Sequence, residues 1–220
     1  MDVLHPHLRS HGEDGRTWPV LVWRSPAGVR TISSAPAGGG LGLRSWVLNA
    51  QVPLSYSRRD PQAHIEALAG SLGLRGCGVG MLTAACTGDV EYASDGDGLG
   101  VQVAATVGLR VPTWAAPATA AERQASVEQV GTINLVAFVP QRLSDAALVN
   151  AVGTATEAKT QALWDAGVAG TGTATDAVCI CCPDEGAPAA FAGPRSTWGA
   201  RLAQVVHASV LAGARTWTPS

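Results

Sequence analysis

Lysine is almost absent from this sequence. Of its 15 basic residues, fourteen are arginine and only Lys159 is lysine. The arginines are scattered along the chain and the formal net charge is −2, so the basic patch typical of nucleic-acid-binding proteins is missing. Arginine in place of lysine, together with many alanines and glycines, is what GC-rich codon usage produces. The single lysine therefore raises the question of what an amine does at that position that a guanidinium cannot do.

Long apolar runs are also missing. No segment reaches the roughly 20 apolar residues that a membrane helix requires. The first residues, MDVLHPHLRSHGEDG, lack the apolar core of a signal peptide. A hydrophobic content of 46% with 15% charged residues predicts a compact globule. We therefore expect a cytoplasmic protein that has neither a membrane nor a nucleic acid as its partner.

The cysteine pattern is not that of a metal site. The five cysteines are Cys77, Cys86, Cys179, Cys181 and Cys182. An odd number in a chain without an export signal predicts free thiols. The CICC cluster has no second Cys or His pair at ligand spacing, so it favours a buried strand in which cysteine acts as a small hydrophobic residue. We expect no bound metal.

Hydrophobic periodicity predicts one α+β domain over residues 1–220, with a mixed, largely antiparallel sheet and a few helices. An α/β layered sandwich is the alternative architecture. Short turns favour an antiparallel meander of the segments 79–84, 89–94 and 99–109. The expected strands are 17–23, 29–35, 45–53, 79–84, 89–94, 99–109, 131–140 and 171–182.

Capping signals place the helices. Asp60 and the proline after it open a helix over 60–74, and Ser144 opens a long helix that runs to about Ala166. A last helix is expected at 197–213. Two segments carry no such signals: residues 1–16 are expected to be flexible, and 112–129 is a candidate loop or lid.

The long helix places Lys159 on its apolar stripe, whereas Glu157 lies on the opposite face. One interpretation is that the stem covers apolar surface and the ammonium reaches water. The other is that the ammonium enters an internal polar site and meets a carboxylate or a substrate. A structural role would accept arginine in this chain, so we favour the second. The other members of the stripe are Leu148, Val152, Ala155 and Leu163.

The segment TGTATDAVCICC supplies a partner for the lysine. Period-2 alternation places Asp176 on an apolar face of the expected strand, with Thr173 and Thr175 on the other face. A buried aspartate is costly unless it is paired, and a Lys159–Asp176 pair would satisfy both charges. The alternative is an aspartate at the strand entry that accepts backbone hydrogen bonds in the GTGT turn.

Other polar features are candidates for ligand binding. Asn134 stands in the apolar strand GTINLVAFVP, where its amide could stabilise an oxyanion or pair with loop backbone. The turn PAGGGLG fits neither glycine-rich phosphate pattern, so it predicts a flexible turn where backbone can approach a ligand. Ser34 precedes this turn, but no histidine lies near it in sequence to complete a triad. Trp114 could line a pocket for a flat ligand or fill the core.

Seven blocks of sequence, taken in order, resemble the adenosylcobinamide amidohydrolase family. The resemblance covers roughly residues 29 to 213, and the blocks are SSAPAGGGLG, LNAQVP, GVGMLTAA, GTINLVAFVP, LSDAALVNAVGTATEAKTQAL, GTGTATDAVCI and GPRSTWG. It implies an enzyme of cobalamin salvage. Such an enzyme hydrolyses the amide between aminopropanol and the corrin ring of adenosylcobinamide, giving adenosylcobyric acid and 1-aminopropan-2-ol. The cobalt belongs to this corrinoid substrate, so the resemblance implies no cofactor.

Amide hydrolysis requires an activated water or nucleophile, donors to the oxyanion and an acid for the leaving amine. Proton transfer is expected of Lys159 and Asp176, and oxyanion stabilisation of Asn134. A hydroxyl nucleophile and a weaker base are sought among Thr173, Thr175 and Glu157. The residues expected to contact the corrinoid are Ser34, Gly38, Gly39, Gly40, Asn49 and Trp114.

Two rival functions stay open at this point. A non-catalytic corrinoid-binding or carrier protein would use the same apolar pocket, but would leave the buried lysine and aspartate without a purpose. A nucleotide-dependent transferase is disfavoured by the failed glycine patterns. The sequence also leaves open whether the protein forms a homo-oligomer.

Overall fold

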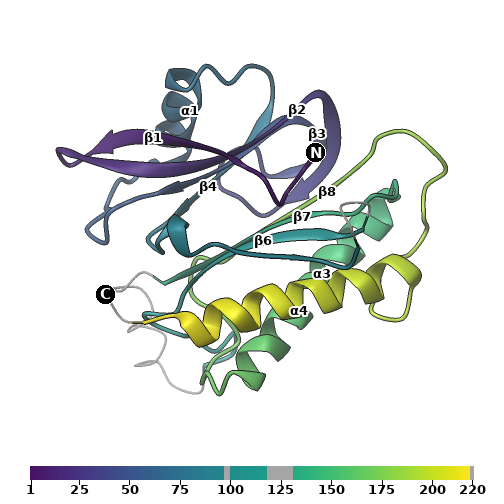
Figure 1. Cartoon of the computed structure of the whole chain (residues 1–220). Coiled ribbons are helices and arrows are strands. Elements are labelled where there is room, and N and C mark those ends of the chain that lie inside the picture. The colour runs from purple at the N-terminus through teal and green to yellow at the C-terminus, as the bar shows by residue number, and fades with distance from the viewer. Residues whose placement is uncertain (97–99, 118–130, 219–220) are drawn as a thin grey trace.

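A computed structural model describes residues 1–96, 100–117 and 131–218 (Figure 1). Over these residues, eight strands form one mixed sheet in the order β4-β3-β2-β8-β7-β6-β5, and β1 pairs with β2. The strands are β1 (His7–Glu13), β2 (Arg16–Ser33), β3 (Gly40–Gln51), β4 (Gly78–Thr83), β5 (Glu91–Ser94), β6 (Gln102–Gly108), β7 (Thr132–Phe138) and β8 (Ala177–Cys182). The α-helices are α1 (Pro61–Ser71), α3 (Asp145–Asp165) and α4 (Thr197–Thr216). The predicted α+β class is confirmed.

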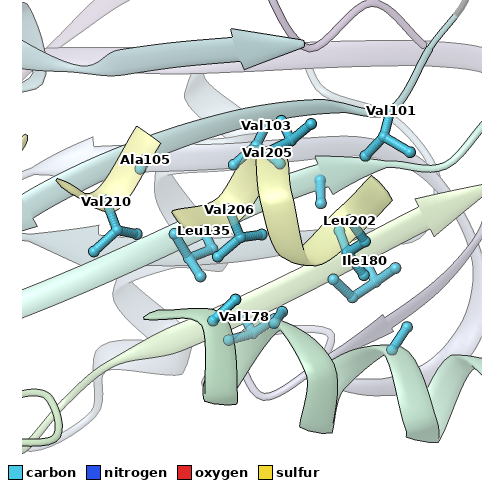
Figure 2. Close-up of a cluster of buried hydrophobic side chains, with 14 of the residues drawn as sticks. Val101, Val103, Ala105, Leu135, Val178, Ile180, Leu202, Val205, Val206 and Val210 are labelled. Carbon is cyan, nitrogen blue, oxygen red and sulfur yellow. The ribbon is translucent and has the colours of Figure 1, made fainter. Parts of the chain in front are cut away.

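The sheet folds over on itself, which gives the molecule four layers. The long strand β2 changes register between Arg24 and Val29, and its first part pairs with β1 whereas its last part pairs with β8. One buried cluster therefore joins inward residues of β2, β3 and β4 to inward residues of β6, β7 and β8. A second cluster packs α1 on the outer face of β2, β3 and β4. The third packs α3 and α4 side by side on the outer face of β6, β7 and β8 (Figures 1 and 2).

The two helices with the strongest sequence signals begin where their capping residues predict. The Asp60 carboxylate accepts a hydrogen bond from the Ala63 N–H at 2.9 Å, and α1 begins at the next residue, a proline. The Ser144 hydroxyl accepts from the Ala147 N–H at 3.1 Å, and α3 follows. Gly167, just past the end of α3, has a φ of 76°, the left-handed conformation that glycine adopts without strain.

The predicted meander of three strands is wrong for its first member. β4 lies at the far edge of the sheet, parallel to β3, and is reached through α1. Only β5 and β6 pair with each other as expected. β4 can occupy that edge because it has glycines where its neighbours press close: a Cβ at Gly78 would meet the Trp46 ring, and one at Gly80 would meet Ile65.

Two further segments differ from the sequence-based expectation. The strand expected from residue 171 begins only at Ala177, because the preceding residues form a turn around Asp176. The expected flexible N-terminus instead includes β1, and Val3 is fully buried while its carbonyl accepts from the Trp23 indole at 3.0 Å. Of the candidate lid at 112–129, the part from 118 onwards lies outside the described residues.

Candidate active site

The Lys159 ammonium is buried and forms an ion pair with the Asp176 carboxylate. Lys159 is only 6% exposed, so the interpretation in which its ammonium reaches bulk water does not hold. The rest of the stripe is buried or half-buried, whereas Glu157 on the opposite face is exposed. The lysine therefore comes from the inner face of α3, and the aspartate from the residue just before β8.

Four donors converge on the Asp176 carboxylate. Its Oδ1 accepts from the Ile133 N–H at 3.0 Å and from the Thr173 hydroxyl at 2.5 Å, and the Thr173 N–H bonds both oxygens at 3.2 Å. Lys159 is the fourth donor and bonds Oδ2. Both interpretations of Asp176 are thus correct: it caps the turn before the strand, and it pairs with the lysine. The carboxylate is held rigidly between β7, β8 and α3.

Gly172 leaves the space in which the ion pair forms. A Cβ at this position would lie 2.5 Å from the Lys159 Nζ and would also meet the Asp176 carboxylate. The Gly172 carbonyl accepts a hydrogen bond from the Thr113 N–H at 2.8 Å, which holds the Gly172 backbone in place. Any side chain here would push the amine and the carboxylate apart, so the sequence GTGT before Asp176 requires its second glycine.

A cavity of about 410 Å³ opens beside the ion pair. It is mostly apolar, as expected for a site that binds a small molecule. The polar residues that line it include Asp176, Thr132, Thr175 and Asn134. Ser34 and Tyr56 lie on its other walls, and a second cavity of about 600 Å³ shares Ala84 and Thr132 with it.

The Asn134 amide is oriented by a buried polar chain that crosses between the two halves of the sheet. Its nitrogen donates to the Asn49 Oδ1 and to the Leu82 carbonyl, both at 2.9 Å. Asn49 in turn donates to the Thr106 hydroxyl at 3.0 Å. Both Asn134 N–H groups are therefore used, and the atom left without a protein partner is the buried Oδ1. This oxygen is a buried acceptor on a residue that lines the cavity.

The two candidate threonines lie differently. Thr175 lines the cavity, and its hydroxyl donates to the Gly131 carbonyl at 2.9 Å and lies 2.7 Å from the Thr132 hydroxyl. The Thr173 hydroxyl points to Asp176 and to the Gly131 carbonyl, and Thr173 is not among the residues that line the cavity. Of the two, Thr175 is the one that a ligand in the cavity can contact.

The residues expected to contact the corrinoid are only partly brought together. Ser34 lines the cavity and Asn49 lies behind it, bonded to Asn134. The glycines at 38–40 form the turn between β2 and β3, where Arg44 donates to the Gly38 carbonyl at 2.9 Å. A Cβ at Gly38 would collide with the Gly78 backbone, so packing explains this glycine. Trp114 is 46% exposed and lines none of the described cavities.

Two features of the site were missed in the sequence. Thr132 opens β7 and lines both cavities, but a threonine at a strand start carries no distinctive signal. Tyr56 lines the cavity from a loop and its hydroxyl lies 3.0 Å from the His64 Nδ1. Burial raises the pKa of Tyr56 and lowers the pKa of His64, so both are neutral at pH 7. The proximity of Tyr56 and His64 depends on how the loop folds onto α1, and no local sequence pattern predicts that.

No helix of the described residues has the length and apolar character needed to span a bilayer.

A buried amine paired with an aspartate that lines a mostly apolar cavity can move protons during hydrolysis. Comparison with known proteins gives the same class and narrows it. Residues 4–220 match the family model described as adenosylcobinamide amidohydrolase, so the chain belongs to the adenosylcobinamide amidohydrolase family and is a hydrolase.

Two relatives carry the same name. The adenosylcobinamide amidohydrolase of Methanosarcina mazei is 30% identical over 189 residues, which are 82% of this chain and 88% of that protein. The one from Halobacterium salinarum is 38% identical over 114 residues, or 51% of this chain and 49% of that protein. The resemblance noted in the sequence is thereby confirmed.

Proposed function

We propose that this protein hydrolyses the amide between aminopropanol and the corrin ring of adenosylcobinamide, giving adenosylcobyric acid and 1-aminopropan-2-ol. The observation that carries the proposal is that Asp176, whose carboxylate is paired with Lys159, lines a mostly apolar cavity. Family membership supports the choice of substrate. We place the reaction in corrinoid salvage, as the sequence resemblance implies, and in the cytoplasm, as the sequence features favour.

The two adjoining cavities suit a large substrate with one reacting side chain. The scissile amide enters the smaller cavity, and the corrin ring lies toward the larger one. The unpartnered Oδ1 of Asn134 accepts the N–H of the scissile amide, which satisfies a buried acceptor and orients the bond. The protein then selects its substrate through this single hydrogen bond and through the shape of the apolar walls of the cavity.

Asp176 acts as the general base. It takes a proton from a water molecule as the water oxygen adds to the amide carbonyl. The Thr175 hydroxyl already donates to the Gly131 carbonyl, so the Thr132 hydroxyl turns from Thr175 and donates to the oxyanion that forms. The proton then passes to the nitrogen as the C–N bond breaks, which yields a carboxylic acid and a free amine. Lys159 neutralises the buried carboxylate and fixes the direction of its Oδ2. These steps need no cofactor.

The proposal is tested by incubating the purified protein with adenosylcobinamide and measuring 1-aminopropan-2-ol and adenosylcobyric acid by mass spectrometry. We expect the two products in equal amounts. Asp176→Asn keeps the shape of the side chain and should reduce kcat by at least about 100-fold, the lower range for loss of a general base. Asp165→Asn, at the exposed end of α3, is the matched control and should retain full activity. Binding of the corrinoid without release of the amine would favour the carrier alternative.

A further inference from the structure

A second cluster of ionisable side chains lies behind Tyr56, which forms part of the wall of the smaller cavity. His11 and Glu13 project from β1 on the same face, and His64 projects from the first turns of α1. All three are largely buried, and one ligand atom from each lies within 4.8 Å of the others. Within the described residues, no other group of three or more His, Cys, Asp or Glu side chains meets this criterion.

Each histidine of this cluster is held by its other ring nitrogen. The His11 Nε2 lies 2.7 Å from the Gln51 carbonyl, which can only accept, so Nε2 carries the hydrogen and the neutral ring has its lone pair on Nδ1. The His64 Nδ1 lies 3.0 Å from the Tyr56 hydroxyl. Histidine ligands of metals are commonly anchored in this way, with the second nitrogen bonded to a carbonyl or another oxygen group.

The separation of His64 and Glu13 also suits a metal better than a direct hydrogen bond. The His64 Nε2 lies 3.5 Å from the Glu13 Oε2, longer than an ordinary N–H···O bond. Two ligands at the usual zinc distances and a tetrahedral angle are about 3.4 Å apart. We propose that His11, Glu13 and His64 form a binding site for a divalent transition metal of the zinc class, with a fourth position for water.

Arg58 is the present counter-ion of Glu13, with its Nε and Nη2 each 2.9 Å from a carboxylate oxygen. The Arg58 side chain is 54% exposed, so it can turn out into solvent, whereas the Glu13 side chain is buried. A divalent ion bound by Glu13 and by both histidines can replace Arg58 as the counter-ion. The metal would tie β1 to α1 and to the loop that carries Tyr56, and so stiffen one wall of the cavity.

The test is zinc binding, measured independently of hydrolysis. Two exposed cysteines, Cys77 and Cys86, could also bind zinc, so the measurements use the full chain with both changed to serine. Protein stripped with a chelator is titrated with ZnCl₂ by calorimetry, and its metal content is measured after dialysis. We expect one ion per chain, thermal stabilisation on binding, and a loss of affinity of at least about 10-fold in His64→Gln and in His11→Gln.

Two further variants separate a metal site from a structural polar cluster. Arg58→Gln removes the competing cation, so it should bind zinc more tightly although it loses an ion pair. His207→Gln removes a histidine that bonds an aspartate elsewhere and should leave binding unchanged. Circular dichroism verifies that each variant is folded. The absence of stoichiometric binding, or equal affinity in the two cluster variants and the parent, would overturn the proposal without affecting the assignment of the hydrolase.

Discussion

Replacing Lys159 by methionine is the sharpest test of the site. Methionine has nearly the length of lysine and leaves the packing of α3 against the sheet intact, but it removes the charge. The Asp176 carboxylate then stays buried, with its side chain 11% exposed, and has no cation beside it. Removing one partner of a buried ion pair typically costs about 3–5 kcal/mol of stability.

The structure narrows this range. Asp176 keeps three neutral donors in the variant: the N–H groups of Ile133 and Thr173 and the Thr173 hydroxyl. These offset part of the lost interaction, so we expect the free energy of unfolding to fall by about 3 kcal/mol, the lower end of the range. Adding Asp176→Asn removes the unpaired charge while keeping an oxygen acceptor for the same donors. The double variant should therefore be more stable than Lys159→Met alone.

Stability is measured by urea denaturation followed by circular dichroism, and activity by release of 1-aminopropan-2-ol. We expect Lys159→Met and the double variant to be inactive, so the double variant separates stability from catalysis. If Lys159→Met changes the free energy of unfolding by less than about 0.5 kcal/mol, the magnitude of an ordinary surface substitution, the ammonium does not balance the carboxylate. Retained activity would equally refute the role given to the pair.

The remaining predictions concern the space around the pair, the hydroxyls and the thiols. Gly172→Ala should abolish activity, because its Cβ collides with the Lys159 Nζ, whereas Gly153→Ala in open space on α3 should stabilise the protein by up to about 1 kcal/mol; equal activity in the two variants would contradict the packing argument. Thr175→Val should lower kcat without loss of fold, whereas Thr173→Val should mainly lower stability in denaturation, since Thr173 supports Asp176. Native protein should react with a thiol reagent at Cys77 and Cys86 alone, because the other three cysteines are buried and burial also raises the pKa of Cys182 to about 11. Modification of Cys182 in folded protein at pH 8, located by peptide mapping, would count against its buried position.

The pairing of Lys159 with Asp176 could be predicted because each residue is anomalous within its own element. A lysine on an apolar helix stripe and an aspartate among apolar strand residues each require a partner. Such local conflicts can be recognised from the sequence alone. The helix ends were predictable for a similar reason, since Asp60 and Ser144 bond backbone groups only three residues away.

Features that depend on strand order were not predictable in the same way. β4 joins β3 instead of β5, and this depends on how α1 crosses the sheet and on glycines that admit Trp46 and Ile65. The orientation of the Asn134 amide is likewise set by Asn49 and Leu82, from strands that reach it only after the sheet has folded over. The sequence identified Asn134 as a polar residue in a core strand, but not which of its atoms is left for a ligand.

The geometry also answers why this position keeps lysine in a chain that otherwise uses arginine. The ammonium is compact, and it occupies the space that Gly172 leaves beside the carboxylate, where even one added carbon would lie 2.5 Å from the amine. A planar guanidinium is wider and cannot fit there without displacing the carboxylate or the backbone at Gly172. Lys159→Arg preserves the charge, yet it should therefore lose activity as completely as Lys159→Met. Lysine is therefore required because its compact ammonium leaves the Asp176 carboxylate in place.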